Sequence, residues 1–394
     1  MDGCEWVEAV YSNTNWADTC ILGTIQETER TRRSVSTGEF YEAQAHPLLR
    51  SHTVAYRDGR RAGGSNRRLH QGRDAKAEYI PGLSLVVLKY GEVIKAEGYG
   101  LANTKLKIPA TPQTVYRIAS VSKQFIAAGI MVLVQEGRLG LGDSVGKYLE
   151  RAPPAWSGIT IQHLLTHTSG LVPEAPGFDP FKIQSDADVI STAHPLPLRF
   201  APGGKWEYSN TGYYVLAEII RTVAGRPWPE YLRDAIFRPS GMNSTWPTNT
   251  TERVPNRAQG YVDNDALRDA PDWLALRPSG AFLSTVLDLA KWDATLYTDR
   301  VLNDSTRRQM WTPVTLNNGS PYPYGFGWMF VDVNGHRLVH HPGGMPGARA
   351  DIARFVDDGI TIILTMNLDD VDINALVTGV AALYLPTRAP STGR

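Results

Sequence analysis

The sequence has few cysteines, no net charge and no long apolar run, and each of these absences excludes a class of protein. Its two cysteines, Cys4 and Cys20, stand within the first 20 of 394 residues, so no disulfide or cysteine–zinc framework holds the remainder. Forty basic residues balance forty acidic ones, which gives no overall attraction to nucleic acid or an anionic membrane surface. The longest apolar run, Phe125–Val134, is half of the ~20 residues that span a bilayer. We therefore expect no nucleic-acid partner and no membrane span.

The first 78 residues differ in composition from those that follow. They are polar, include an arginine-rich stretch at 57–73 and show little periodicity. This predicts a loosely ordered extension, with a partner-binding arm as the alternative. The first ten residues are acidic and lack the basic and apolar segments of a secretory signal, which indicates a cytoplasmic location. From 79 to 388 we expect a single domain, followed by a tail at 389–394.

Strand-like segments lie at both ends of this domain. Leu83–Lys89 and Val93–Tyr99 are β-rich runs separated by a short turn, which predicts a hairpin. Near the other end we expect four strands and a closing helix, at 327–332, 337–341, 348–355, 360–366 and 372–385. We therefore predict an α+β fold in which one antiparallel sheet is built from residues 79–118 and 322–388. An all-helical lobe, 119–321, is inserted between them.

The helical lobe is expected to surround Phe125–Val134. This segment is apolar on nearly every side, which predicts a buried helix. The stretch 173–202 is rich in proline and acids and predicts a long surface excursion. Hydrophobic spacing and capping residues predict further helices at 160–165, 213–223 and 229–237, and one capped by Ser284 or Thr285.

Ser120 and Lys123 stand at the start of the buried helix, three residues apart and therefore on one face. A lysine in the first turn opposes the helix dipole, so stability alone does not explain it. A hydroxyl beside a desolvated amine can act as a nucleophile. Lys123 would then need a pKa lowered from ~10.4 towards 7, by burial or by a second cation. The alternatives are that Ser120 caps the helix and that Lys123 is solvated.

Three short patterns carry the candidate chemistry: S-x-x-K at Ser120–Lys123, Y-x-N at Tyr208–Asn210 and H-x-G at His341–Gly343. Each pattern also occurs a second time, at Ser144–Lys147, Tyr11–Asn13 and His70–Gly72. The second copies lack a buried helix behind them or lie in the polar extension, so we favour the first set.

The remaining histidines of this region show no metal-ligand spacing, so we predict no metal and no cofactor. We expect His163 and His167 to satisfy local backbone groups. His340 should point to the strand face opposite to His341, because side chains alternate along a strand.

The three patterns resemble those of the serine β-lactamase and penicillin-binding-protein superfamily, in the class C-like branch with DD-peptidases, D-aminopeptidases and family VIII carboxylesterases. The likeness covers about residues 79–388. It is supported by the phrases I-T-I-Q-H-L-L-T-H-T-S-G-L (159–171), P-G-G-K-W-E-Y-S-N-T-G-Y (202–213), Y-G-F-G-W (324–328) and H-P-G-G-M-P-G (341–347). The chain has no G-x-S-x-G, so an α/β-hydrolase would lack its nucleophile.

The resemblance implies that 79–388 is a catalytic domain in which Ser120 forms an acyl-enzyme. Lys123 would accept the hydroxyl proton, and Tyr208 would shuttle protons and activate water. Asn210 would contact the acyl side of the substrate, and the N–H of Gly344 would pair with that of Ser120 as the oxyanion hole. The other expected substrate-binding residues are His341, Gly343, Tyr324 and Met345.

His341 stands where β-lactamases carry the lysine of K-T-G, and a histidine is mostly neutral at pH 7. We therefore expect a carboxylesterase acting on short-acyl esters. A D-amino-acid amidase or DD-peptidase, or a weak β-lactamase, is the alternative. A non-catalytic acyl-binding sensor on the same fold and an acyl transferase also remain open. The expected partner is a small-molecule ester or amide, and the sequence gives no oligomeric state.

Overall fold

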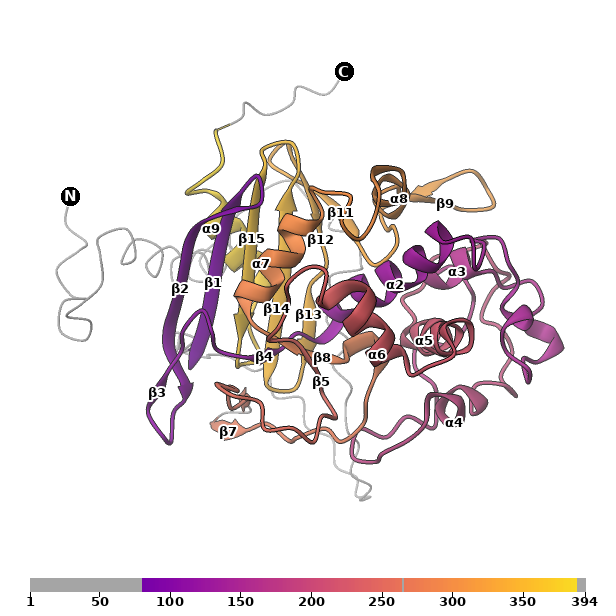
Figure 1. The fold of residues 1–394 in the computed structure, drawn as a ribbon, viewed down its shortest axis with the longest axis horizontal. Coiled ribbons are helices and arrows are strands. Elements are labelled where there is room, and N and C mark those ends of the chain that lie inside the picture. Colours follow the sequence, from indigo (N-terminus) through magenta and orange to yellow (C-terminus); the bar gives the residue numbers. More distant parts are fainter. Residues whose placement is uncertain (1–79, 264–265, 388–394) are drawn as a thin grey trace, which may run out of the picture. The chain divides into compact units, whose positions relative to one another are not determined.

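The computed structural model describes residues 80–263 and 266–387. The predicted extension 1–78 and tail 389–394 lie outside these residues. Within them, eight strands form one antiparallel sheet in the order β11-β12-β14-β15-β1-β2-β3, with β13 paired to β14 (Figure 1). The strands are β1 (Gly82–Lys89), β2 (Glu92–Asn103), β3 (Ile108–Pro109), β11 (Met329–Val333), β12 (His336–His340), β13 (Gly343–Met345), β14 (Ala348–Phe355) and β15 (Ile360–Met366).

The centre of the sheet joins the two ends of the domain. β1 pairs with β2 on one side and with β15 on the other, with Leu83 opposite Met366. β1 is buried on both faces because helices α7 (Val286–Thr295) and α9 (Ile373–Ala381) cover opposite sides of the sheet (Figure 1). A strand buried on both faces needs a near-continuous apolar run, as G-L-S-L-V-V-L provides. The prediction of a sheet assembled from both chain ends is confirmed.

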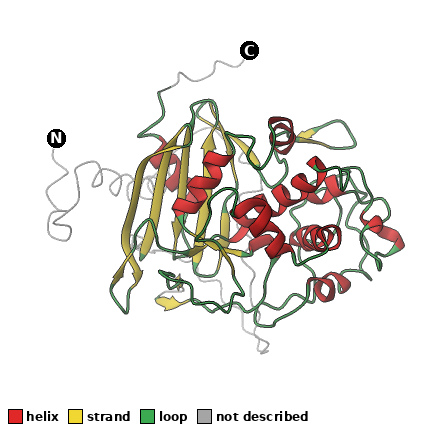
Figure 2. Cartoon of the chain, viewed as in Figure 1, coloured by secondary structure: helices red, strands yellow, loops and turns green. Residues whose placement is uncertain are grey.

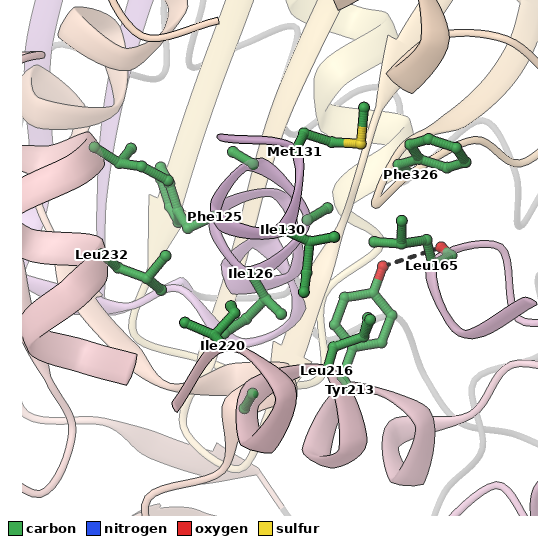
Figure 3. Packing of buried hydrophobic residues seen from close by; sticks show 14 of the residues in the cluster. Phe125, Ile126, Ile130, Met131, Leu165, Tyr213, Leu216, Ile220, Leu232 and Phe326 are labelled. Atoms are coloured by element: carbon green, nitrogen blue, oxygen red, sulfur yellow. Dashed lines mark hydrogen bonds between the residues drawn. The ribbon is translucent and has the colours of Figure 1, made fainter. Parts of the chain in front are cut away.

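Apart from α7 and α9, the helices gather with α2 (Lys123–Gln135) beside the sheet (Figure 2). α2 is buried from Lys123 to Leu133, as its all-round apolar sequence predicts. Phe125 contacts Phe237 edge-on with ring centroids 5.2 Å apart, and Gly129 lets Leu232 approach the helix backbone. Figure 3 shows Phe125, Ile126 and Ile130 of α2 among the apolar side chains that surround it. The other helices of this part are α3 (Ile161–Leu165), α4 (Asp186–Ser191), α5 (Asn210–Ala224), α6 (Trp228–Leu232) with the π-helical turn η5 (Arg233–Phe237), and α8 (Asp304–Met310).

Short elements connect these two parts. A small sheet joins β4 (Tyr116–Arg117), β8 (Phe282–Ser284) and β5 (Trp246–Pro247), and two further pairs are β6 (Tyr261–Asp263) with β7 (Leu267–Asp269) and β9 (Val314–Thr315) with β10 (Pro321–Tyr322). The 3₁₀ turns are η2 (Ala119–Ser122), η3 (Val145–Lys147), η4 (Pro154–Trp156) and η6 (Pro278–Gly280).

Helix ends follow the sequence signals closely. The hydroxyl of Thr285 accepts a hydrogen bond from the N–H of Asp288 and caps α7. Ser209 caps α5 in the same way through the N–H of Gly212. α5 ends at Gly225, whose φ of 70° is the left-handed conformation that glycine adopts without steric cost.

Four features differ from the sequence-based expectation. The range 119–321, expected to be all-helical, also contains the short strands β5 to β9. α7 falls in the range assigned to the helical lobe, yet it packs on β1 and β15 because its apolar side chains complete the sheet core. The excursion 173–202 contains α4, whose Val189 and Ile190 are buried. β13 was not predicted, since it is three residues long and two of them are glycine. Within the described residues, no helix combines the length and apolarity needed to cross a membrane.

Candidate active site

Ser120 lies in the turn η2, immediately before α2. Neither Ile118 nor Ser122, the residues at the capping positions of η2 and α2, makes a side-chain cap hydrogen bond. Ser120 itself is inside the turn, so the alternative role of a helix cap is not realised. Ala119, which precedes it, has a φ of 45°, a conformation uncommon for a residue with a side chain. Strained backbone of this kind persists where surrounding structure fixes it, often at functional sites.

Lys123 is fully buried, and its amine is surrounded by three oxygen atoms. Nζ lies 3.2 Å from Ser120 Oγ, 2.9 Å from Asn210 Oδ1 and 3.0 Å from the carbonyl oxygen of Ser279. Burial, and secondarily the positive charge of Arg277, hold the pKa of Lys123 well below its ordinary value. The solvated first-turn lysine considered from the sequence is therefore not what the structure contains.

Asn210 is held by groups on both ends of its amide. Its Oδ1 accepts from Lys123, and its Nδ2 donates to Glu174 Oε2 at 3.2 Å. Glu174 also forms an ion pair with Arg277, whose guanidinium lies over the rings of Phe178 and Trp273. The cation near Lys123 is thus partly compensated by a carboxylate on the far side of Asn210. Ser209, rather than Asn210, caps α5.

Tyr208 brings its ring against the same amine. Lys123 Nζ lies 4.6 Å from the centroid of the Tyr208 ring. Burial raises the pKa of Tyr208 above its ordinary value, and a hydrogen bond with Ser120 opposes that rise. The phenol, the hydroxyl and the amine therefore meet in one place, although Tyr208 lies far from the other two in the sequence.

His341 and Tyr324 are buried next to these groups, at 1% and 0% exposure. His341 Nε2 lies 3.0 Å from the Tyr324 hydroxyl. Burial, together with the nearby positive charge of Lys123, lowers the pKa of His341 to about 3. We expected Tyr324 to contact substrate, but it is fully buried against the rings of His167 and Trp206.

The glycine-bordered strand β13 runs beside the Ser120 turn. A Cβ at Gly343 would lie 2.3 Å from the carbonyl oxygen of Ile118 and 3.0 Å from the N–H nitrogen of Ser120, so the protein's own turn requires glycine there. Gly344 is exposed, and Met345 is 9% exposed and packs with Ala119. Gly343 is therefore needed for the approach of β13 to the nucleophile turn.

The second S-x-x-K copy has no comparable surroundings. The Ser144 hydroxyl donates to the carbonyl of Ser157 and accepts from the N–H of Gly146 as the cap of η3. Lys147 is exposed and paired with Asp143. Both residues have local structural roles.

Three site residues were not found from the sequence: His167, Glu174 and Arg277. The expectation that His167 satisfies local backbone groups is wrong, because its ring bonds the backbone N–H of Ser209, 42 residues away. His163 does bond locally, accepting from the N–H of Thr160. Glu174 and Arg277 lie outside helices and strands, and no periodic pattern marks them.

Comparisons with known proteins agree with this arrangement. A family model described as Beta-lactamase matches residues 67–382. Penicillin-binding protein 4* of Bacillus subtilis (strain 168) is 33% identical over 303 residues, which cover 71% of this chain and 66% of that protein. D-aminopeptidase of Gluconobacter oxydans (strain 621H) is 28% identical over 300 residues, which cover 73% of this chain and 56% of that protein. The chain thus spans between 56% and 66% of the length of these two curated relatives.

Solved structures share the fold. The octameric penicillin-binding protein homologue from Pyrococcus abyssi matches with a TM-score of 0.69 at 29% identity, covering 77% of this chain and 73% of that one. D-amino acid amidase from Ochrobactrum anthropi SV3 matches with a TM-score of 0.68 at 26% identity, covering 77% and 94%. These structures share with this chain a fold that combines an antiparallel sheet with helices.

Proposed function

The chain belongs to the beta-lactamase family and is a serine hydrolase, as its motifs indicate, and from that premise we propose that it hydrolyses amides or short peptides of D-amino acids through an acyl-enzyme on Ser120. The observation that carries the proposal is the buried amine of Lys123, 3.2 Å from Ser120 Oγ. The substrate class is supported by the names of similar proteins, D-aminopeptidase and D-amino acid amidase.

The hydrogen bonds of Lys123 suit a proton acceptor. A neutral amine has two N–H donors and one lone pair. Asn210 Oδ1 and the carbonyl of Ser279 are acceptors only, so they take both donors. The Asn210 amide has this orientation because its Nδ2 faces the carboxylate of Glu174. The lone pair of the amine is then left for the hydroxyl proton of Ser120.

In the proposed reaction, Ser120 Oγ bonds to the substrate carbonyl carbon as its proton passes to Lys123. The electron pair of the carbonyl moves to its oxygen, which the N–H groups of Ser120 and Gly344 would stabilise. The carbon–nitrogen bond then breaks, and the leaving amine takes a proton relayed from Lys123 through Tyr208. Water then bonds to the acyl carbon as its proton passes through Tyr208 to Lys123. The bond between that carbon and Ser120 Oγ breaks, Oγ takes the proton back from Lys123, and the acid is released.

A carboxylesterase acting on short-acyl esters is the second candidate. It is favoured by His341, a buried neutral group at the position where β-lactamases carry a lysine. The same reaction would then break a carbon–oxygen bond. A β-lactam, with its carboxylate, would find no permanent cation at this position.

The test is a substrate panel on the full chain: D-phenylalaninamide and its L enantiomer, a D-Ala-D-Ala peptide, p-nitrophenyl butyrate and nitrocefin. We expect turnover of the D-amide over the L-amide, with an acyl group on Ser120 detected by mass spectrometry after acid quench. Faster ester turnover without a preference for the D-amide would favour the carboxylesterase. Stable acylation of Ser120 without turnover would favour an acyl-binding sensor.

A further inference from the structure

A continuous row of hydrogen bonds runs behind the candidate site, from the Y-x-N segment to the H-x-G segment. The N–H of Ser209 donates to His167 Nδ1 at 3.1 Å. His167 Nε2 lies 3.0 Å from the Tyr324 hydroxyl, which lies 3.0 Å from His341 Nε2. His341 Nδ1 then lies 2.8 Å from the carbonyl oxygen of Pro342. The row begins with a group that can only donate and ends with a group that can only accept.

The donor at one end, Ser209 N–H, and the acceptor at the other, the Pro342 carbonyl, determine which ring nitrogens carry protons in between. Because His167 Nδ1 accepts from Ser209, the proton of a neutral His167 must be on Nε2, which donates to the Tyr324 oxygen. Because His341 Nδ1 donates to Pro342, a neutral His341 has its lone pair on Nε2, where it accepts the Tyr324 hydroxyl proton. Both imidazoles are buried, and burial lowers the pKa of each ring, which disfavours a positive charge on either.

His167 also contacts the ring of the candidate proton carrier. Its ring centroid lies 4.3 Å from that of Tyr208 and 5.2 Å from that of Tyr213. The ring of Trp206 is nearly perpendicular to that of His167, with centroids 5.8 Å apart. His167 is 1% exposed and has a φ of 59°, so the chain holds it in an uncommon backbone conformation at the centre of this aromatic cluster.

We propose that His167 is a positioning residue, which through Tyr324 holds His341 as its neutral Nδ1–H tautomer and through Ser209 and ring contact holds Tyr208 against Lys123. The importance of this arrangement for turnover rests on the proposed function. The tautomers of His167 and His341 follow from the hydrogen bonds alone and do not rest on it. In water the Nδ1–H form of histidine is the minor neutral tautomer, so its presence at His341 would report the two bonds that favour it, from Nδ1–H to the Pro342 carbonyl and from the Tyr324 hydroxyl to Nε2.

Long-range ¹H–¹⁵N correlation spectra of the full chain, labelled on histidine, test the tautomers directly. Signals of His167 and His341 are assigned from the variants His167→Asn and His341→Asn. At pH 7 we expect His167 protonated on Nε2 and His341 on Nδ1. Tyr324→Phe removes the donor, and we expect His341 to move towards the Nε2–H form. A wild-type His341 that is Nε2–H or doubly protonated overturns the proposal, whatever the enzyme does with any substrate.

Kinetics test the positioning role. His167→Asn keeps an oxygen that can accept from Ser209 and tolerates the left-handed backbone, but it loses the donor to Tyr324. We expect kcat to fall by about tenfold or more with little change in KM. His163→Asn, in the helix α3 that ends just before His167 and outside the row, is the matched control and should retain kcat. If His167→Asn does not fold, Tyr324→Phe gives the same comparison. Unchanged kcat in a folded variant overturns the role.

Discussion

Lys123 Nζ lies 2.9 Å from Asn210 Oδ1, a contact that joins two segments 87 residues apart in the sequence. It connects the start of α2 to the start of α5, the two helices at the centre of the helical part. Because the amide oxygen can only accept, this contact also engages one N–H of the Lys123 amine as a donor. The chemistry proposed for Ser120 therefore depends on how α5 packs against α2.

The first prediction distinguishes the two S-x-x-K copies. Ser120→Ala removes the hydroxyl beside the buried amine, and we expect kcat/KM for the best substrate of the panel to fall by about 10³-fold or more. Ser144→Ala removes only the cap of η3 and its bond to Ser157, so activity should remain. Steady-state kinetics on both variants check this. Activity lost in Ser144→Ala and kept in Ser120→Ala would contradict the assignment.

The second prediction concerns the acid limb of the pH profile of kcat/KM. Lys123 must be neutral to accept a proton, so activity is lost as the pH falls through its pKa. Burial, and after it the positive charge of Arg277, hold that pKa down. Arg277→Gln removes the cation and leaves Glu174 unpaired, so the pKa of Lys123 should rise. We expect the acid limb to move to higher pH by about one unit.

Glu174→Gln should shift the acid limb of the pH profile in the opposite direction. It removes a carboxylate on the Asn210 side and leaves Arg277 uncompensated, so the pKa of Lys123 should fall. The acid limb should then move to lower pH than in the wild type. Shifts in the same direction for both variants would mean that another group controls the limb.

The sequence predicts those features that depend on local spacing. Ser120 and Lys123 share a face because they are three residues apart, and α2 is buried because its sequence is apolar all round. The contacts of Glu174, Arg277 and His167 depend on loops brought together by packing, which spacing does not encode. His167 in particular resembles a local capping residue in the sequence, and only the position of Ser209 shows otherwise.

The third prediction compares the two glycines of β13. A Cβ at Gly343 would meet backbone atoms of Ile118 and Ser120, which cannot move without moving the nucleophile. We expect Gly343→Ala to lower kcat/KM by about 10²-fold. At Gly344 the atoms nearest to a Cβ belong to the side chain of Arg349, whose guanidinium end can turn away. Gly344→Ala keeps its N–H, so its kcat/KM should fall much less. Steady-state kinetics on the two variants check the difference.

The fourth prediction concerns the buried ion pair between α7 and the sheet. Arg354 Nε donates to Asp293 Oδ1 at 2.6 Å, and the hydroxyl of Thr361 donates to the same oxygen at 3.0 Å. The side chains are 3% and 0% exposed. Arg354→Met leaves a buried carboxylate without its cation, and we expect the free energy of unfolding to fall by about 3–5 kcal/mol, measured by urea denaturation.

The control for this prediction is the exposed pair Lys105–Asp269, whose Nζ and Oδ2 are also 2.6 Å apart. Water solvates both charges there, so Lys105→Met should cause little or no loss of stability. Replacing both buried partners, with Asp293→Leu added to Arg354→Met, removes the uncompensated charge and should recover part of the loss. Equal effects at the buried and exposed pairs would mean that Arg354 stabilises through its contacts with Tyr297 and Trp311 rather than through its charge.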